Sequence, residues 1–472
     1  MENHMRKFFV LFTLIISTCL VAGDNTDKTF IHALYTKTQL NHASYKLLRE
    51  LTAQYPRRLA GSPGADGAVQ WARRTMQQLG FDRVYLQEIK VPHWERGEAE
   101  ACYVVFPDNH REKLSVLALG RSVPTPGGEL LAPLYVAHDV DDIKKADPEA
   151  VKGRIVFFNA AFPDTFLQTM HGYGRAVQKR VWGPSEAARK GAVAVIIRSV
   201  TTAHDDAPHT GTLVYAGDAP KVPAAALGYL SADRLYEYWK RNKNIKVSLR
   251  INSRIFPDKT SYNVIGELTG RKHPEQIIAI GGHLDAWDVG EGAQDDGAGI
   301  VHSIGALALL KQAGYQPQNT IRAVCFMNEE NGLRGGKAYA RIAKEKKEKH
   351  IVAIESDAGG FTPRGFGYSG PEAGLKQLNE WLPLFPPFTI QAIRPSGGGA
   401  DIGPLHKAMS TPVMSLIPDN QRYFDFHHSH KDVFSAVNRR ELELGTASVA
   451  ALLYLIDQYG LNNGVKHSAS HP

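Results

Sequence analysis

Cysteine is scarce in this chain of 472 residues, which contains only Cys19, Cys102 and Cys325. So few cysteines exclude a multi-disulfide scaffold. Cys102 and Cys325 are far apart in the sequence, and we expect both to be buried small hydrophobic side chains. Neither lies near a histidine in the sequence, and the chain has no G-x-S-x-G motif. Nothing therefore indicates a nucleophilic cysteine or serine.

Long apolar runs are also missing, except at the N-terminus. The segment MENHMRKFFVLFTLIISTCLVAG places Arg6 and Lys7 before an apolar run from Phe8 to Ala22. This order predicts a signal peptide over residues 1–23, and hence a secreted or periplasmic protein with no stable membrane insertion after cleavage. The alternative is an uncleaved membrane anchor, for which the run is short.

Neither sign of charge dominates the composition. The chain has 55 Lys and Arg against 48 Asp and Glu, and its formal net charge of +7 falls to +6 when residues 1–23 are removed. The basic run KEKKEKH at 344–350 predicts a solvated helical face, and we do not expect nucleic-acid binding. The motif GFGYSG at 365–370 lacks the helix and the later acidic partner of a nucleotide site, so we expect a loop there.

The organisation of the chain changes twice along its length. Within residues 24–111, ASYKLLRELTAQY and AVQWARRTMQQLG have helical spacing, and VYLQEIKV reads as a strand. Residues 112–252 have short β-rich segments, such as LLAPLYVA and AVAVIIRS, and one predicted helix, PSEAARKGA. We therefore expect an α/β domain, residues 24–111 and 253–465, interrupted by a small β-rich domain.

Strands and helices alternate after residue 261. Strands are predicted at YNVIGELTG, QIIAIGGH, TIRAVCFMNEE and IVAIESDAGG, and helices at AGIVHSIGALALLKQAG and GGKAYARIAKEKK. This alternation is typical of a mainly parallel mixed sheet flanked by helices, in the α/β class. Reactive side chains collect beyond the carboxyl ends of the strands in such sheets.

Polar side chains gather at these strand ends. His283 and Asp285 end one strand, Glu329 and Glu330 follow the next, and Asp357 follows a third. Each group alone is more often a satisfied polar pair or a solvated surface than a metal site. Three acidic groups at one edge of a sheet would repel each other, however, and cations resolve that conflict.

Further candidate ligands lie outside the strand ends. Asp295 and Asp296 stand at the head of a predicted helix, and FDFHHSHKD contains His427, His428 and His430. Imidazole nitrogens and carboxylate oxygens without cysteine form a ligand set that suits zinc.

In this order and spacing, HLDAWDVGEGAQDDGAG, NEENGLRGG, ESDAGG and HHSHKD resemble motifs of the co-catalytic dizinc exopeptidases related to bacterial leucyl aminopeptidase and glutamate carboxypeptidase. The likeness covers essentially the whole mature chain, because the β-rich insertion resembles the protease-associated domain of several members. It implies the zinc exopeptidase fold and hydrolysis of dipeptides and other short peptides, with carboxypeptidase action favoured.

The same resemblance implies two zinc ions per chain. One would be held by His283, Asp295 and Asp357, and the other by Asp295, Glu330 and His428, so that Asp295 bridges them.

Other positions match supporting roles in that family. Glu329 matches the general base, and Asp285 matches a carboxylate that hydrogen-bonds the imidazole of His283. Asp296 follows the bridging acid, often through a cis peptide in the family. His427 departs from the pattern of some relatives, so the resemblance assigns no oxyanion donor; it also leaves His427 as a rival ligand, although HSHKD favours His428.

Several alternatives stay open in the sequence. An aminopeptidase with the same metal core is the second candidate, and Asp401 in SGGGADIGPL would then meet a substrate amine or else cap a turn. Some relatives are non-catalytic, but every expected ligand type is present here. A homodimer is possible. Asp288 and Glu291 receive no role, and we expect them in a solvated loop.

Overall fold

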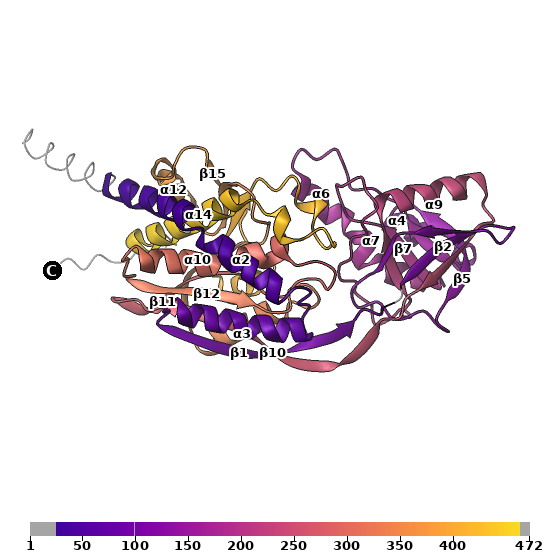
Figure 1. Ribbon diagram of the computed structural model, residues 1–472, viewed down its shortest axis with the longest axis horizontal. Helices are drawn as coiled ribbons and strands as arrows, with labels where there is room; N and C mark the ends of the chain where they lie inside the picture. Colours follow the sequence, from indigo (N-terminus) through magenta and orange to yellow (C-terminus); the bar gives the residue numbers. More distant parts are fainter. Residues whose placement is uncertain (1–24, 99, 463–472) are drawn as a thin grey trace, which may run out of the picture.

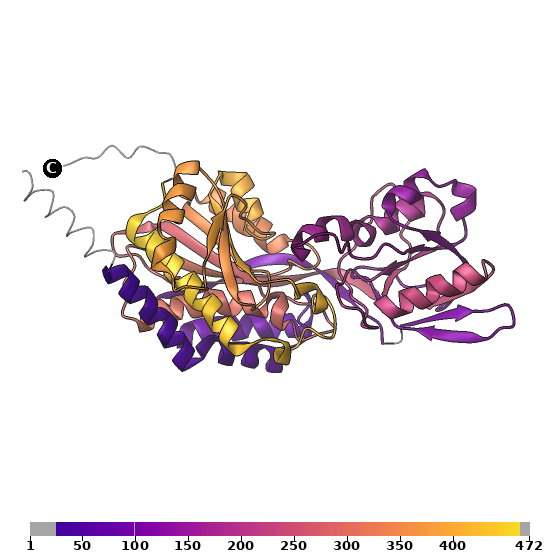
Figure 2. The ribbon, with the colours of Figure 1, turned by 90° about the horizontal axis from the view of Figure 1, so that it is seen from above.

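The computed structural model describes residues 25–98 and 100–462. Two eight-stranded sheets lie in two lobes, and the long strands β1 (Arg83–Glu95) and β10 (Arg254–Leu268) run from one lobe to the other (Figures 1 and 2). The predicted signal peptide lies outside the described residues. Among the described residues, no helix is long and apolar enough to span a membrane.

The first sheet is mixed, with a parallel centre. Its strand order is β1-β10-β12-β11-β13-β16-β14-β15, and β12, β11, β13 and β16 run parallel to one another. The pairs β1–β10, β10–β12 and β16–β14 are antiparallel, and the edge pair β14–β15 is parallel. The remaining strands are β11 (His273–His283), β12 (Asn319–Phe326), β13 (Lys349–Glu355), β14 (Pro363–Ser369), β15 (Ala392–Arg394) and β16 (Val413–Pro418).

Helices cover both faces of this sheet, because successive side chains of the buried strands point to opposite faces. Ile278 and Ile280 of β11 belong to the core with α2 (Ala43–Gln54), α3 (Pro63–Gln78), α10 (Ala298–Gln312) and α14 (Arg439–Tyr459). Ile277 and Ala279 pack instead with α11 (Arg334–Glu345) and α13 (Gly403–Met409). Helix α12 (Glu372–Glu380) lies near the edge, next to β15.

The sequence-based assignment of this domain agrees with most of these elements. The predicted strands at 84–91, 262–270, 276–283, 320–330 and 351–360 correspond to β1, β10, β11, β12 and β13. The chain is also helical over residues 25–41, which the sequence analysis did not identify. The run 344–350 is mostly exposed, as expected, but it is helical only at its start, since α11 ends at Glu345 and β13 begins at Lys349. The loop expected at 365–370 is wrong, because β14 covers residues 363–369.

The second sheet is formed by residues 101–250 and has the order β3-β2-β9-β5-β6-β7-β8-β4. Strands β5 to β8 are parallel, and the flanking pairs are antiparallel. The bounds are β2 (Ala101–Val105), β3 (Arg111–Leu114), β4 (Val116–Ala118), β5 (Leu130–Ala137), β6 (Ile155–Phe158), β7 (Ala194–Arg198), β8 (Ala224–Leu227) and β9 (Lys246–Arg250).

The expectation of a single helix in this region is wrong. The second lobe contains α4 (Val140–Lys145), α5 (Pro148–Val151), α6 (Thr169–Ala176), α7 (Gln178–Val181), α8 (Gly183–Arg189) and α9 (Tyr229–Arg241). One core cluster lies under α9, and another lies under α4 and α8. The helix predicted at 184–192 corresponds to α8, whereas α4 to α7 have eight residues or fewer, too short for a 3.6-residue period to stand out. With these helices and the 13-residue α9, the lobe is α/β rather than β-rich.

Candidate metal centre

Three neighbouring parallel strands bring the predicted side chains to one edge of the first sheet. His283 is the last residue of β11, Glu329 and Glu330 follow the end of β12, and Asp357 follows the end of β13. Parallel strands end at the same edge, so these side chains converge as the sequence predicted.

Asp295 lies at the centre of the cluster. Its Oδ1 is 3.1 Å from Nε2 of His283, and its Oδ2 is 3.2 Å from Nε2 of His428. His283 Nε2 is also 3.6 Å from Oδ1 of Asp357, and His428 Nε2 is 3.0 Å from Oε2 of Glu330. Asp295 thus lies among the four other residues that the resemblance implies as ligands.

The donor set fits divalent cations. Asp295 Oδ2 and Glu330 Oε1 are buried carboxylate oxygens that accept no hydrogen bond from any described residue. A buried acceptor without a donor costs roughly 1–3 kcal/mol, and more when it is charged. His283, Asp295 and Glu330 each offer one ligand atom within 4.8 Å of the others, as do Asp295, His427 and His428. These are nitrogen and oxygen donors of the kind that zinc accepts.

The cluster shifts the pKa values of its members strongly. Burial acts to raise the pKa of Asp295, but the neighbouring imidazoles of His283 and His428 hold it well below its usual range. Burial lowers the pKa of His428, yet Glu330 and Asp295 outweigh it and raise the pKa to about 9. Burial also raises the pKa of Glu330 to about 7. Some of these groups therefore carry protons, and metal ions that bind to the groups would displace those protons.

Asp285 supports the site differently from the predicted way. The Nδ1 of His283 is 2.9 Å from the main-chain carbonyl oxygen of Asp285 and 4.0 Å from its carboxylate. The carboxylate instead accepts the main-chain N–H groups of Asn328 at 2.7 Å, Glu329 at 3.1 Å and Glu330 at 3.3 Å. The expected carboxylate–imidazole hydrogen bond is therefore absent between these residues, and Asp285 holds the segment that carries the acids.

Asp296 orients the neighbouring backbone. Its Oδ2 accepts the main-chain N–H of His283 at 3.0 Å, and its Oδ1 accepts that of Gly299 at 2.9 Å. The Asp295–Asp296 peptide bond is cis, as the resemblance implied.

The three histidines of FHHSH occupy different environments. His428 Nε2 contacts both Asp295 and Glu330, whereas His427 Nε2 is 3.7 Å from Asp295 and has no other acidic neighbour within 4.0 Å among the described residues. The two rings stack with centroids 3.5 Å apart. Burial, followed by the charge of His428, holds the pKa of His427 well below its usual range. His430 is exposed. The geometry favours His428 over His427 as a ligand.

Two supporting residues escaped the sequence analysis. Asp432 accepts the main-chain N–H groups of Ala293, Gln294 and Asp295 at 3.0, 2.7 and 3.1 Å. Arg58 is fully buried, and its guanidinium donates to the carbonyl oxygens of residues 284, 291 and 292 at 2.6, 2.6 and 2.7 Å. Asp432 is the acid of the motif HHSHKD, but the partners of both residues follow only from the fold, because each lies far along the chain from the segment that it holds.

The expectation of a solvated loop for Asp288 and Glu291 is wrong. Asp288 accepts two hydrogen bonds of 2.9 Å from the guanidinium of Arg96, and Glu291 accepts the main-chain N–H of Phe434 at 2.6 Å. Arg96 also donates to the carbonyl oxygen of Ala118 in the second lobe at 2.6 Å. Asp288 therefore joins the metal-centre segment to the second lobe.

Asp401 is buried next to the cluster. Its main-chain N–H donates to Glu355 at 3.0 Å, but neither of its carboxylate oxygens has a hydrogen-bond partner among the described residues. The turn-capping alternative is therefore wrong for its side chain. Burial, then the charges of Glu355 and Glu329, holds the pKa of Asp401 well above its usual range.

A cavity of about 500 Å³ opens over the cluster. Asp295, Glu329, Glu330, Asp357 and His428 line it from the first lobe, and the second lobe contributes Arg121, Met170, Tyr173, Arg180, Thr212 and Val214. This volume is in the range of small-molecule sites. The site is thus built by both lobes.

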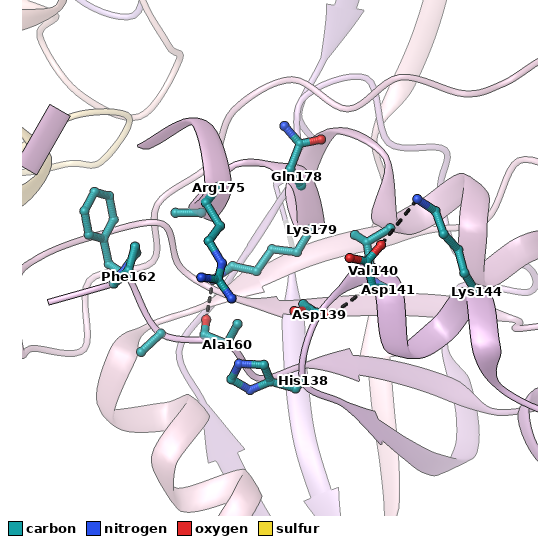
Figure 3. A pocket seen from close by; sticks show the side chains of 13 residues that line it. His138, Asp139, Val140, Asp141, Lys144, Ala160, Phe162, Arg175, Gln178 and Lys179 are labelled. Atoms are coloured by element: carbon teal, nitrogen blue, oxygen red, sulfur yellow. Dashed lines mark hydrogen bonds and ion pairs between the residues drawn. The ribbon is translucent and has the colours of Figure 1, made fainter. Parts of the chain in front are cut away.

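Another cavity, of about 520 Å³, is lined by second-lobe residues between His138 and Lys179 (Figure 3). Lys179 is buried there and donates to the carbonyl oxygen of Ala160. Burial lowers the pKa of Lys179 to about 7. No metal-binding cluster was found at this cavity among the described residues, so the first cavity is the better candidate site.

The chain is similar in sequence to known peptidases. A model of the family described as peptidase family M28 matches residues 263–453. Carboxypeptidase Q of Homo sapiens is 35% identical over 441 residues, covering 93% of this chain and 90% of that protein.

Two solved structures extend the comparison. The peptidase M28 precursor of Shewanella amazonensis is 34% identical, with a TM-score of 0.88 over 92% of this chain and 97% of its own. A zinc aminopeptidase of Bacillus subtilis shares the fold, with a TM-score of 0.61 and 20% identity over 87% of this chain and 94% of its own.

Proposed function

Since this chain belongs to peptidase family M28 and is a metallo-exopeptidase, we propose that it is a secreted enzyme that uses two zinc ions to hydrolyse dipeptides and other short peptides, as a relative of carboxypeptidase Q. One observation carries the proposal. The buried Asp295 carboxylate lies 3.1 Å from His283 and 3.2 Å from His428, so a single side chain can serve two metal ions. We also propose that the second lobe is the protease-associated-like insertion.

The residues divide into two ligand sets. His283, Asp295 and Asp357 would hold one zinc ion, and Asp295, Glu330 and His428 would hold the other. Bound zinc polarises a peptide carbonyl and lowers the pKa of water towards neutrality.

Glu329 is placed for proton transfer. It lines the cavity beside the ligands, and Asp285 fixes its main chain. Burial, followed by the charge of Asp357, holds the pKa of Glu329 well above its usual range, although the charge of His283 opposes this shift. Glu329 would accept a proton from the attacking water and donate it to the leaving amine.

The test is Glu329→Gln. We expect zinc content equal to that of the wild type and a loss of kcat of at least about 100-fold, because general acid–base catalysis contributes that much. Zinc is measured by mass spectrometry, and turnover on an unblocked dipeptide by amine release. Asp295→Ala is the matched variant and should lose both zinc and activity. Near-normal turnover by Glu329→Gln would contradict the proposal.

An aminopeptidase is the second candidate, since the zinc aminopeptidase of Bacillus subtilis shares this fold. Hydrolysis of one dipeptide with its N-terminus blocked, compared with the same dipeptide blocked at the C-terminus, separates the two. Loss of cleavage on C-terminal blocking favours the carboxypeptidase.

A further inference from the structure

Arg180, in the helix α7, is a buried cation with few partners. Its residue is 4% exposed, and its Nη2 donates to the hydroxyl of Tyr173 at 2.8 Å. Its Nη1 lies 3.5 Å from the carbonyl oxygen of Thr210 and 3.2 Å from Nδ1 of His428. The Nε atom is buried and has no hydrogen-bond partner among the described residues.

The charge of Arg180 lacks a direct counter-ion. No carboxylate oxygen of the described residues lies within 4.0 Å of its guanidinium, whereas the buried Arg198 and Arg322 each have one at 2.7–2.8 Å. Arg58 also lacks an ion pair, but its three nitrogens donate to carbonyl oxygens at 2.6–2.7 Å. A buried guanidinium charge is costly unless it is paired.

The acids that line the cavity do not neutralise the charge of Arg180 when the metal centre holds its two ions. Among the residues that line the cavity, Asp295, Glu329, Glu330 and Asp357 supply four carboxylates, and two divalent ions offset four negative charges. This step rests on the proposed function. In the loaded enzyme the guanidinium is therefore left to attract an anion from outside the chain.

Arg180 is also fixed in place. A Cβ atom at Gly211 would lie 2.4 Å from its Nη1 and 2.5 Å from its Cζ, so the guanidinium packs directly on the backbone of this glycine, whose φ is +130°. Tyr173 holds the opposite side through its hydroxyl. Such a rigid fork suits two-point recognition of a carboxylate.

Arg180 lines the same cavity as Asp295, Glu329 and His428, and it touches the ring of His428. One residue of extended peptide spans about 3.5 Å. A carboxylate one residue beyond the scissile carbonyl would therefore reach this guanidinium, whereas the terminus of a longer leaving peptide would lie beyond it. We propose that Arg180 binds the free α-carboxylate of the substrate's C-terminal residue and thereby selects substrates with one residue after the scissile bond. Tyr173 positions the guanidinium.

Two other cations line the cavity and serve as controls. Arg121 and Lys337 are both exposed, and Lys337 donates to the carbonyl oxygen of Gly332. Lys179 precedes Arg180 in the chain but lines the other cavity (Figure 3). These three residues test whether any nearby positive charge is sufficient to bind the substrate's α-carboxylate.

The experiment compares zinc-loaded wild type with Arg180→Gln and Arg180→Lys. For each enzyme, kcat/KM is measured on an unblocked dipeptide and on the same dipeptide with a C-terminal amide. We expect the wild type to prefer the free carboxylate and Arg180→Gln to lose about 10- to 100-fold of that preference, as expected for charge-assisted hydrogen bonds. Arg121→Gln, Lys337→Gln and Lys179→Gln should retain the wild-type preference.

A binding measurement gives a readout without turnover. Calorimetric titration with the free amino acid product and with its amide should show tighter binding of the free acid to the wild type and a smaller difference in Arg180→Gln. If Arg180→Gln does not fold, Tyr173→Phe replaces it and should raise KM for the free dipeptide more than for the amide.

Three outcomes would overturn the inference. The first is an unchanged preference in Arg180→Gln, the second is an equal loss on both substrates, which would place Arg180 at the reacting carbonyl, and the third is a loss caused instead by Arg121→Gln. A zinc-loaded wild type that cleaves neither dipeptide would contradict the proposed function, while Arg180-dependent binding of the free amino acid would still support carboxylate recognition.

Discussion

Single residues of this site carry several contacts at once. Asp295 faces two imidazoles with its side chain while its main-chain N–H donates to Asp432. Asp285 receives three main-chain N–H groups with its carboxylate and the imidazole of His283 with its carbonyl oxygen. Replacing any of these side chains should therefore disturb metal binding and proton transfer together.

Asp285→Asn tests this at the residue scale. The amide keeps the shape but loses the charge, and its NH₂ group would face main-chain N–H groups of residues 328–330. We expect kcat to fall about 10- to 100-fold with weaker zinc retention, the usual cost of losing an outer partner of a metal site. Kinetics and zinc titration measure the two effects. A wild-type kcat would show that the three donors do not need the carboxylate charge.

Among the elements, the segment from residue 284 to residue 297 depends most on distant partners. It leaves β11, carries Asp295 and enters α10, and Arg58 and Asp432 satisfy its main-chain groups from opposite ends of the chain. Buried main-chain polar groups must be paired, and here side chains replace a ladder or a regular helix. The shape of the metal centre is therefore set by hydrogen bonds from outside the segment.

Arg58→Met tests the segment as an element. Methionine fills space but leaves the carbonyl oxygens of residues 284 and 291 without donors, whereas that of Gly292 keeps the main-chain N–H of Gly297. We expect the free energy of unfolding to fall by at least about 2 kcal/mol, since each lost donor costs about 1–3 kcal/mol. Denaturant titration gives this value. The exposed Arg57→Met is the control and should change stability little; an equal effect of both variants would contradict the assignment.

In the whole molecule, the active cavity forms where the two lobes meet. The second lobe is inserted between β1 and β10, and it contributes Tyr173, Arg180 and Thr212 to a cavity whose acids come from the first lobe. Arg96 connects the two lobes, because its guanidinium donates hydrogen bonds to the carboxylate of Asp288 in the metal-centre segment and to the carbonyl oxygen of Ala118 in the second lobe. The relative position of the lobes should therefore affect substrate binding.

A double-mutant cycle on Arg96→Ala and Asp288→Ala tests this coupling. Both side chains are largely buried and meet through two hydrogen bonds of 2.9 Å. We expect a coupling energy of about 1–3 kcal/mol in stability and a higher KM with a smaller change in kcat for each single variant. The exposed pair Arg341 and Glu345 is the control and should couple by less than about 1 kcal/mol. If the stability changes of Arg96→Ala and Asp288→Ala are additive in the double variant, the proposed coupling between the two side chains is wrong.

Local pattern was enough to predict much of the first lobe. The strands β10 to β13 were identified because they are buried, apolar and bounded by glycine or polar residues, and the acids at their ends follow from strand direction. Cys102 and Cys325 are buried and unpaired, as the composition indicated. The short helices α4 to α7 of the second lobe were missed because four to eight residues give no clear period, whereas α8 was predicted.

The sequence by itself determined which chemical groups are available and which strand ends carry them, because residue type and strand periodicity are local properties of the chain. Only the tertiary structure decided which groups meet: that His428 contacts two acids where His427 contacts one, that Asp285 holds main-chain N–H groups, and that Arg180 of the other lobe faces the cavity. These contacts join segments far apart in the sequence, and their geometry depends on packing between whole elements rather than on any pattern within one.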